Sequence, residues 1–164
     1  MPVSNFENGD RRDACPTVMS MFISHSPAET ESLGEAWGRA AQHGCVIALS
    51  GELGAGKTQL VKGVARGLGV MTRVHSPAFT LVNEYRGGRL RLFHLDLYRL
   101  ETREQILSAG LEEFLSPDGV TVIEWAERLE DGRWKMEDGK KVVRVVIEIT
   151  GEMERRIIYD GSGA

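Results

Sequence analysis

The sequence has few cysteines, no long apolar run and no excess of basic residues, and each shortage excludes a class of protein. Its two cysteines, Cys15 in a polar segment and Cys45 at the start of an apolar one, form neither a disulfide framework nor a metal-ligand spacing. We expect two free thiols in a reducing cytoplasm. No apolar segment approaches the roughly 20 residues that cross a bilayer, so we expect no membrane association.

Acidic residues outnumber basic ones, with 24 Asp and Glu against 20 Lys and Arg, a net charge of −4. Because a protein that holds nucleic acid by its own surface needs clustered Lys and Arg, we expect no stable nucleic-acid binding by this chain alone. Residues 1–20 are polar and lack the apolar core of a signal peptide. We interpret them as a flexible leader and residues 21–164 as one domain.

Apolar periodicity and turn residues predict strands alternating with helices. A helix is expected between Ser26 and Gly44, because Ser26, Pro27 and Glu29 form an N-terminal capping pattern. The other helices are expected over residues 57–68 and 102–110, and the strands over residues 21–23, 45–49, 79–85, 90–95, 120–123, 142–149 and 155–159. This order favours a three-layer α/β domain with a mixed central sheet, part parallel and part antiparallel.

A glycine-rich segment between a buried strand and a helix carries the clearest chemistry. Residues 51–58, Gly-Glu-Leu-Gly-Ala-Gly-Lys-Thr, match the pattern G-x-x-x-x-G-K-[ST] of P-loop NTPases. Glycines let successive backbone N–H groups converge on phosphate oxygens, and the following helix directs its positive dipole end at the same anion. We expect nucleotide phosphates at Gly51, Leu53, Gly54, Ala55, Gly56, Lys57 and Thr58, with the Thr58 hydroxyl on Mg²⁺.

A dinucleotide-binding fingerprint is the rival interpretation of the same glycines. The third glycine of that pattern would fall at position 59, where the chain has Gln59, so the pattern fails. A plain β–α turn has no reason to place Lys57 and Thr58 directly after Gly56.

Two acidic residues are candidates for metal binding and hydrolysis. Asp96 and Glu124 each follow a predicted strand, at the edge where α/β folds bind ligands. We expect them to bind Mg²⁺, directly or through water, and to orient the attacking water, with either residue able to fill either role. His94 is a candidate proton carrier or a residue that orients a neighbour, and we favour the second role. Thr80 is a candidate sensor of the γ-phosphate.

These segments together resemble the TsaE family, the ATPases required for threonylcarbamoyl modification of adenosine in bacterial tRNA. The likeness spans about residues 21–160. It is carried by residues 51–58, Ser76-Pro77-x-Phe79-Thr80-Leu81, His94-x-Asp96-x-Tyr98-Arg99 and Glu124-Trp125. Ala78 and Gln59 stand where the family usually has Thr.

The resemblance implies the ligands, the site residues and the partners. It implies bound ATP and Mg²⁺, with Thr30 near the nucleotide. It also implies functional roles for Lys57, Thr58, Thr80, Asp96 and Glu124. A family member would not transfer the threonylcarbamoyl group itself. It would bind a heterodimer of two related proteins, TsaB and TsaD, the second being the transferase, and ATP hydrolysis would reset that complex. Its contact with tRNA would be indirect, and the modified tRNAs would be those that read ANN codons.

Two other functions are compatible with the phosphate loop. A small-molecule kinase would use the same loop, although the segment after the phosphate-binding helix is strand-rich and shows no separate helical lid with clustered Arg. A nucleotide-binding scaffold without turnover would need the loop but not Asp96 and Glu124. The choice of ATP over GTP comes from the resemblance, since no Asn-Lys-x-Asp element is present.

Overall fold

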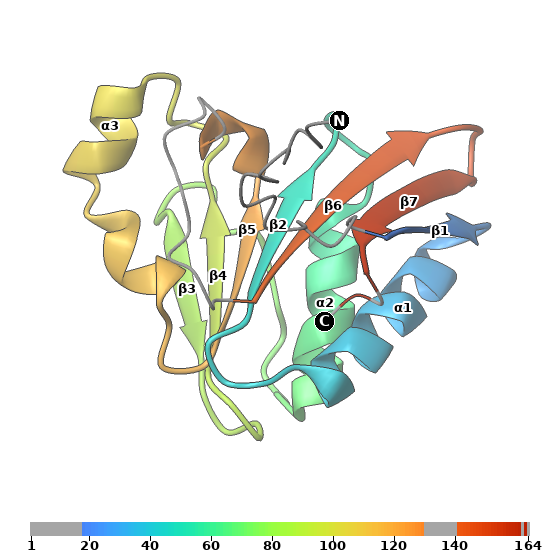
Figure 1. Ribbon diagram of the computed structural model, residues 1–164, viewed down its shortest axis with the longest axis horizontal. Helices are drawn as coiled ribbons and strands as arrows, with labels where there is room; N and C mark the ends of the chain where they lie inside the picture. The colour runs from blue at the N-terminus through green and yellow to red at the C-terminus, as the bar shows by residue number, and fades with distance from the viewer. Residues whose placement is uncertain (1–17, 130–140, 162, 164) are drawn as a thin grey trace, which may run out of the picture.

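Strands β1 to β7 form one mixed sheet in the computed structural model, which describes residues 18–129, 141–161 and 163 (Figure 1). The strands are β1 (Met19–Ser24), β2 (Val46–Ser50), β3 (Val82–Tyr85), β4 (Leu92–Asp96), β5 (Val120–Glu124), β6 (Val142–Ile149) and β7 (Arg155–Asp160). Their order across the sheet is β1-β7-β6-β2-β5-β4-β3. The central strands β6, β2, β5 and β4 are parallel, and antiparallel pairs lie at both edges. The predicted mixed α/β sheet is confirmed.

Helices cover the sheet in two groups. α1 (Pro27–Ala40) and α2 (Lys57–Leu68) lie side by side on one face, as Figure 1 shows. The other group joins α3 (Arg103–Ser108) to the short 3-10 helices η1 (Leu111–Leu115) and η2 (Ala126–Leu129). No helix in the described ranges has the length and apolar character needed to cross a membrane.

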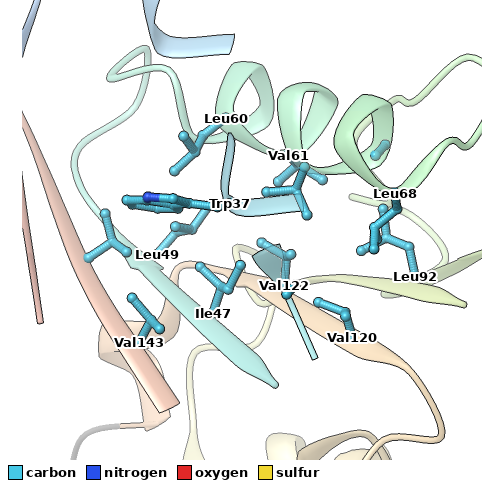
Figure 2. Packing of buried hydrophobic residues seen from close by; sticks show 14 of the residues in the cluster. Trp37, Ile47, Leu49, Leu60, Val61, Leu68, Leu92, Val120, Val122 and Val143 are labelled. Carbon is cyan, nitrogen blue, oxygen red and sulfur yellow. The ribbon is translucent and has the colours of Figure 1, made fainter. Parts of the chain in front are cut away.

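Alternate residues of the central strands build an apolar cluster on each face of the sheet. Ile47 and Leu49 point to the α1–α2 side, where they pack near Trp37 (Figure 2). Val46 belongs to the second cluster, with Ile123 and residues of η1 and η2. β2 is therefore buried on both faces, as its continuous apolar run predicts.

Most predicted boundaries lie within two residues of those observed, but two predictions were wrong. The strand expected from residue 79 begins at Val82, because the Leu81 N–H donates to the Pro77 carbonyl (2.7 Å) and closes a turn, with Leu81 at φ 66°. The helix expected to continue to Gly44 ends at Ala40, and residues 43–44 form a turn before β2.

The first strand overlaps the segment expected to be a leader. β1 begins at Met19, which pairs with Asp160 of β7, so the strand includes the last two residues of the range 1–20. Residues 1–17, with Cys15, lie outside the described residues. Cys45 is a free, buried thiol, and burial raises its pKa.

Glycines let α1 and α2 approach each other backbone to backbone. A Cβ at Gly63 of α2 would overlap the carbonyl oxygen of Glu31 in α1, and a Cβ at Gly38 of α1 would overlap that of Val64 in α2. Gly34 and Gly67 are equally crowded by the opposite helix. This contact fixes α2 against α1 and so helps to position the glycine-rich loop at the amino end of α2.

The crossing predicts the effect of a single methyl group. Alanine normally stabilises a helix interior relative to glycine, by about 1 kcal/mol. At Gly63 we expect the opposite, a loss of about 1–3 kcal/mol in unfolding free energy for Gly63→Ala, because α1 must move away. Urea unfolding of the two proteins measures this difference in unfolding free energy. Gly151→Ala is the control, since a Cβ there meets only the Glu154 residue of an exposed turn. A Gly63→Ala protein as stable as the parent would contradict the close crossing.

Candidate functional site

The loop between β2 and α2 leaves the amino end of α2 without a side-chain cap. Gly54 and Gly56 have φ angles of 81° and 103°, in the left-handed region that favours glycine. Gly56 is the N-cap residue, and no side-chain cap hydrogen bond is present there among the described residues. Since the first N–H groups of a helix have no acceptor within it, and the positive dipole end lies there, this end suits an anion.

The Lys57 ammonium is buried beside this loop. Its Nζ donates to the carbonyls of Gly51 (2.6 Å) and Glu52 (2.9 Å) and lies 4.1 Å from the centre of the Trp125 ring. Burial lowers the pKa of Lys57, while nearby carboxylates, first that of Glu124, act in the opposite direction. An anionic ligand would add to the interactions that keep this group charged.

The Glu124 carboxylate joins α2 to the end of β5. The Thr58 hydroxyl donates to Glu124 Oε1 at 2.7 Å, and His94 Nε2 lies 2.7 Å from the same oxygen. His94 is fully buried, and its Nδ1 has no hydrogen-bond partner among the described residues. The expectation that His94 orients a neighbour matches this contact, since the imidazole fixes the carboxylate that faces Thr58.

Asp96 occupies the matching position on the adjacent strand. It ends β4 and is paired in register with Glu124 of β5. Ser76 Oγ donates to Asp96 Oδ2 at 2.6 Å, and the Tyr98 N–H donates to Oδ1 at 2.9 Å. Both carboxylates are therefore almost buried, held by hydrogen bonds and directed at the carboxyl edge of the parallel strands.

Two cavities adjoin the phosphate loop. The larger, of about 450 Å³, is lined by Leu53, Gly54, Gly56, Lys57, Thr58, Ser76, Ala78, Asp96, Tyr98, Glu124 and Trp125. The smaller, of about 160 Å³, is lined by Ser26, Pro27, Thr30, Gly54, Ala55, Gly56, Gln59, Glu152, Met153 and Arg155. Because Gly54 and Gly56 line both, a ligand held by the loop can extend into either.

The family of the chain follows from a match over most of its length. Residues 24–157 match the family model described as threonylcarbamoyl adenosine biosynthesis protein TsaE. The chain belongs to the TsaE family. This family takes part in the biosynthesis of threonylcarbamoyladenosine in tRNA.

Individual TsaE proteins are similar over most of the chain. The Bacillus subtilis (strain 168) protein is 38% identical over 138 residues, covering 84% of this chain and 83% of the relative. The Nostoc sp. (strain PCC 7120) protein is 48% identical over 115 residues, which cover 68% of this chain and 70% of the relative. Both are named tRNA threonylcarbamoyladenosine biosynthesis protein TsaE. The crystal structure of Bacillus subtilis YdiB has a TM-score of 0.70 at 33% identity, covering 90% of this chain and 88% of that one.

The structure of this TsaE chain brings most of the predicted site residues together. Lys57, Thr58, Asp96 and Glu124 line the larger cavity, and Thr30 lines the smaller one, where its hydroxyl lies 2.7 Å from Ser24 Oγ. Thr80 lies apart from them on an exposed turn, where its hydroxyl donates to Asn83 Oδ1 at 3.2 Å. Its role as a γ-phosphate sensor stays a prediction.

Arg155 is a site residue that the sequence did not indicate. It starts β7, and its guanidinium donates to the carbonyls of Ala55 (3.2 Å) and Gly54 (3.3 Å) in the phosphate loop. No motif marks it, because the contact joins segments about 100 residues apart through the sheet. Trp125 lines the larger cavity, with a φ angle of 60°.

Proposed function

We propose that this TsaE chain binds and hydrolyses ATP, with Mg²⁺, as an accessory protein of tRNA threonylcarbamoylation acting on a TsaB/TsaD heterodimer. One observation carries the proposal. An uncapped helix end, a buried ammonium and two strand-end carboxylates all face one cavity. Positive groups at the loop and acidic groups opposite them suit a nucleotide whose phosphates bind on one side and whose metal ion binds on the other.

The phosphates would bind at the amino end of α2. Backbone N–H groups of residues 54–58 would donate to phosphate oxygens, and Lys57 would add a full positive charge. The ammonium already lies against the loop carbonyls of Gly51 and Glu52, so little side-chain freedom remains to be lost on binding.

The residues that would hold Mg²⁺ are Thr58, Asp96 and Glu124. The described residues contain no cluster of three or more His, Cys, Asp or Glu side chains able to hold a metal by themselves. This fits Mg²⁺, which commonly binds through one or two carboxylates together with substrate phosphates. When bound, the ion would neutralise charge on the phosphates. A carboxylate that holds the ion through water rather than directly would also orient the attacking water.

The partners follow from the family rather than from the geometry. The TsaE family takes part in the biosynthesis of threonylcarbamoyladenosine, and the resemblance implies that TsaD transfers the threonylcarbamoyl group. The acidic charge of this chain suits a protein whose contact with tRNA is indirect. A reducing cytoplasm suits the free thiol of Cys45.

Removal of the Lys57 ammonium tests the phosphate site. Lys57→Ala should weaken ATP binding by about tenfold or more, equivalent to ~1.4 kcal/mol or more, because it removes the charge that faces the phosphates. Calorimetric titration with Mg-ATP measures the affinity. Lys62→Ala, in the same helix but outside both cavities at the loop, is the control and should bind like the parent. Retention of ATP affinity within about twofold in Lys57→Ala would contradict the phosphate assignment.

The second prediction separates binding from hydrolysis. Glu124→Gln should lower turnover by about a hundredfold while ATP affinity changes much less, because the carboxylate acts on metal and water rather than on the base or sugar. Phosphate release and ATP titration measure the two effects. Glu112→Gln, on an exposed residue of η1, is the control. Equal loss of binding and turnover in Glu124→Gln would point to a role in folding and contradict this separation.

The same assay distinguishes the competing functions. Phosphate release is measured with ATP alone, with the TsaB/TsaD heterodimer and with candidate small metabolites. We expect turnover to rise with the heterodimer and no metabolite to be phosphorylated. Transfer of phosphate to a metabolite would establish a kinase, and no phosphate release in any mixture would establish a scaffold.

A further inference from the structure

Three large side chains remain exposed at the rim of the larger cavity. Phe79 is 82% exposed, Leu53 73% and Tyr98 44%. Leu53 and Tyr98 line the cavity, and Phe79 follows Ala78, which also lines it. Single exposed apolar residues are ordinary on a protein surface, but a group gathered at the mouth of a functional cavity marks an interaction site.

Arg99 completes this group with an uncompensated charge. Its guanidinium carbon lies 3.9 Å from the centre of the Phe79 ring. Within the part of the chain that the structure describes, no carboxylate pairs with Arg99, although the chain is acidic overall. Aromatic and arginine side chains together are the residues that contribute most binding energy at protein interfaces. We call Leu53, Phe79, Tyr98 and Arg99 the rim patch.

The rim patch is tied to the proposed magnesium ligand Asp96. Phe79 lies on the turn of residues 77–81, and both Ser76, which precedes the turn, and Leu81, at its end, are hydrogen-bonded to Asp96. Ser76 Oγ donates to the Asp96 carboxylate at 2.6 Å, and the backbone N–H of Asp96 donates to the Leu81 carbonyl at 3.0 Å. Tyr98 donates its N–H to the same carboxylate. A partner seated on the rim patch would therefore touch the segments that hold the nucleotide site.

We propose that the rim patch docks a protein surface that offers an apolar recess for the Phe79 ring beside a carboxylate for the Arg99 guanidinium. The inference rests on the proposed function for the identity of that protein, the TsaB/TsaD heterodimer. Burial of the ring removes apolar surface from water, and a carboxylate gives the guanidinium two parallel hydrogen bonds while it stays stacked.

An RNA partner is the alternative that the charges disfavour. A base can stack on Phe79 or Arg99, but the chain carries a net charge of −4. Single strands are held by a basic groove that follows the backbone, and within the rim patch only Arg99 is basic.

Binding of the purified TsaB/TsaD heterodimer to the full chain in saturating Mg-ATP tests the proposal. We expect Phe79→Ala and Arg99→Glu each to weaken the complex by about tenfold or more, ~1.4 kcal/mol. Arg99→Lys, which keeps the charge but loses the planar fork, should fall between Arg99→Glu and the parent. ATP affinity and the circular dichroism spectrum should stay unchanged in each, because these side chains are exposed.

Met71→Ala and Arg73→Glu are the matched controls. Met71 is 95% exposed and follows the far end of α2, and Arg73 is an exposed arginine on the same segment. Both should bind the heterodimer like the parent. Weakening by the control substitutions as strong as by the rim substitutions would show a general effect of surface change and overturn the proposal.

The remaining outcomes separate this inference from the proposed function. A parent chain that does not bind the heterodimer contradicts the proposed partner and the rim patch together. A parent that binds, with Phe79→Ala and Arg99→Glu binding within about twofold, overturns the rim patch alone. A parallel titration with a tRNA transcript tests the alternative. Loss of tRNA binding in these variants, with the heterodimer still bound, would assign the rim patch to RNA.

Discussion

The carboxyl ends of three adjacent parallel strands bring the whole site within reach of one cavity. β2 leads into the phosphate loop, β5 ends at Glu124 and β4 ends at Asp96. The register between β4 and β5 sets the two carboxylates side by side, and the bond from Thr58 to Glu124 joins the first turn of α2 to them. The helix is in turn held by its glycine contact with α1, so each part of the site depends on the packing of the sheet and this helix pair.

This arrangement places polar groups where an apolar core would be more stable. Lys57, His94, Asp96 and Glu124 are all buried or nearly so. Each of these side chains makes at least one hydrogen bond, which offsets the loss of contact with water. The second ring nitrogen of His94, Nδ1, is buried and has no partner in the described part of the chain. Leu81, in the turn before β3, and Trp125, which lines the cavity, adopt positive φ angles. Groups and backbone that violate ordinary folding preferences gather at functional sites, where the surrounding structure holds them in place.

Local patterns predicted the parts of the fold and site that local physics determines. Residues 57–68 form a helix with the predicted ends, because glycines lie at both boundaries and apolar residues recur at helical spacing. The phosphate-loop motif and the acids at the strand ends were also predicted, because each is defined by residues that are neighbours in the sequence. The start of β3 was predicted wrongly, since the turn before it places Leu81, not glycine, in the left-handed region. Arg155 was missed because only the pairing of β7 within the sheet brings it to the loop.

Nuclear magnetic resonance of the ¹⁵N-labelled chain tests the central claim directly, because it reports on each backbone N–H separately. The claim is that the amides of residues 54–58 bind nucleotide phosphates. Titration with Mg-ATP should move the amide signals of Gly54, Gly56, Lys57 and Thr58, while adenosine at the same concentration should leave them in place, because it lacks phosphates. The claim would be contradicted if these four amides did not respond to millimolar Mg-ATP in the folded protein.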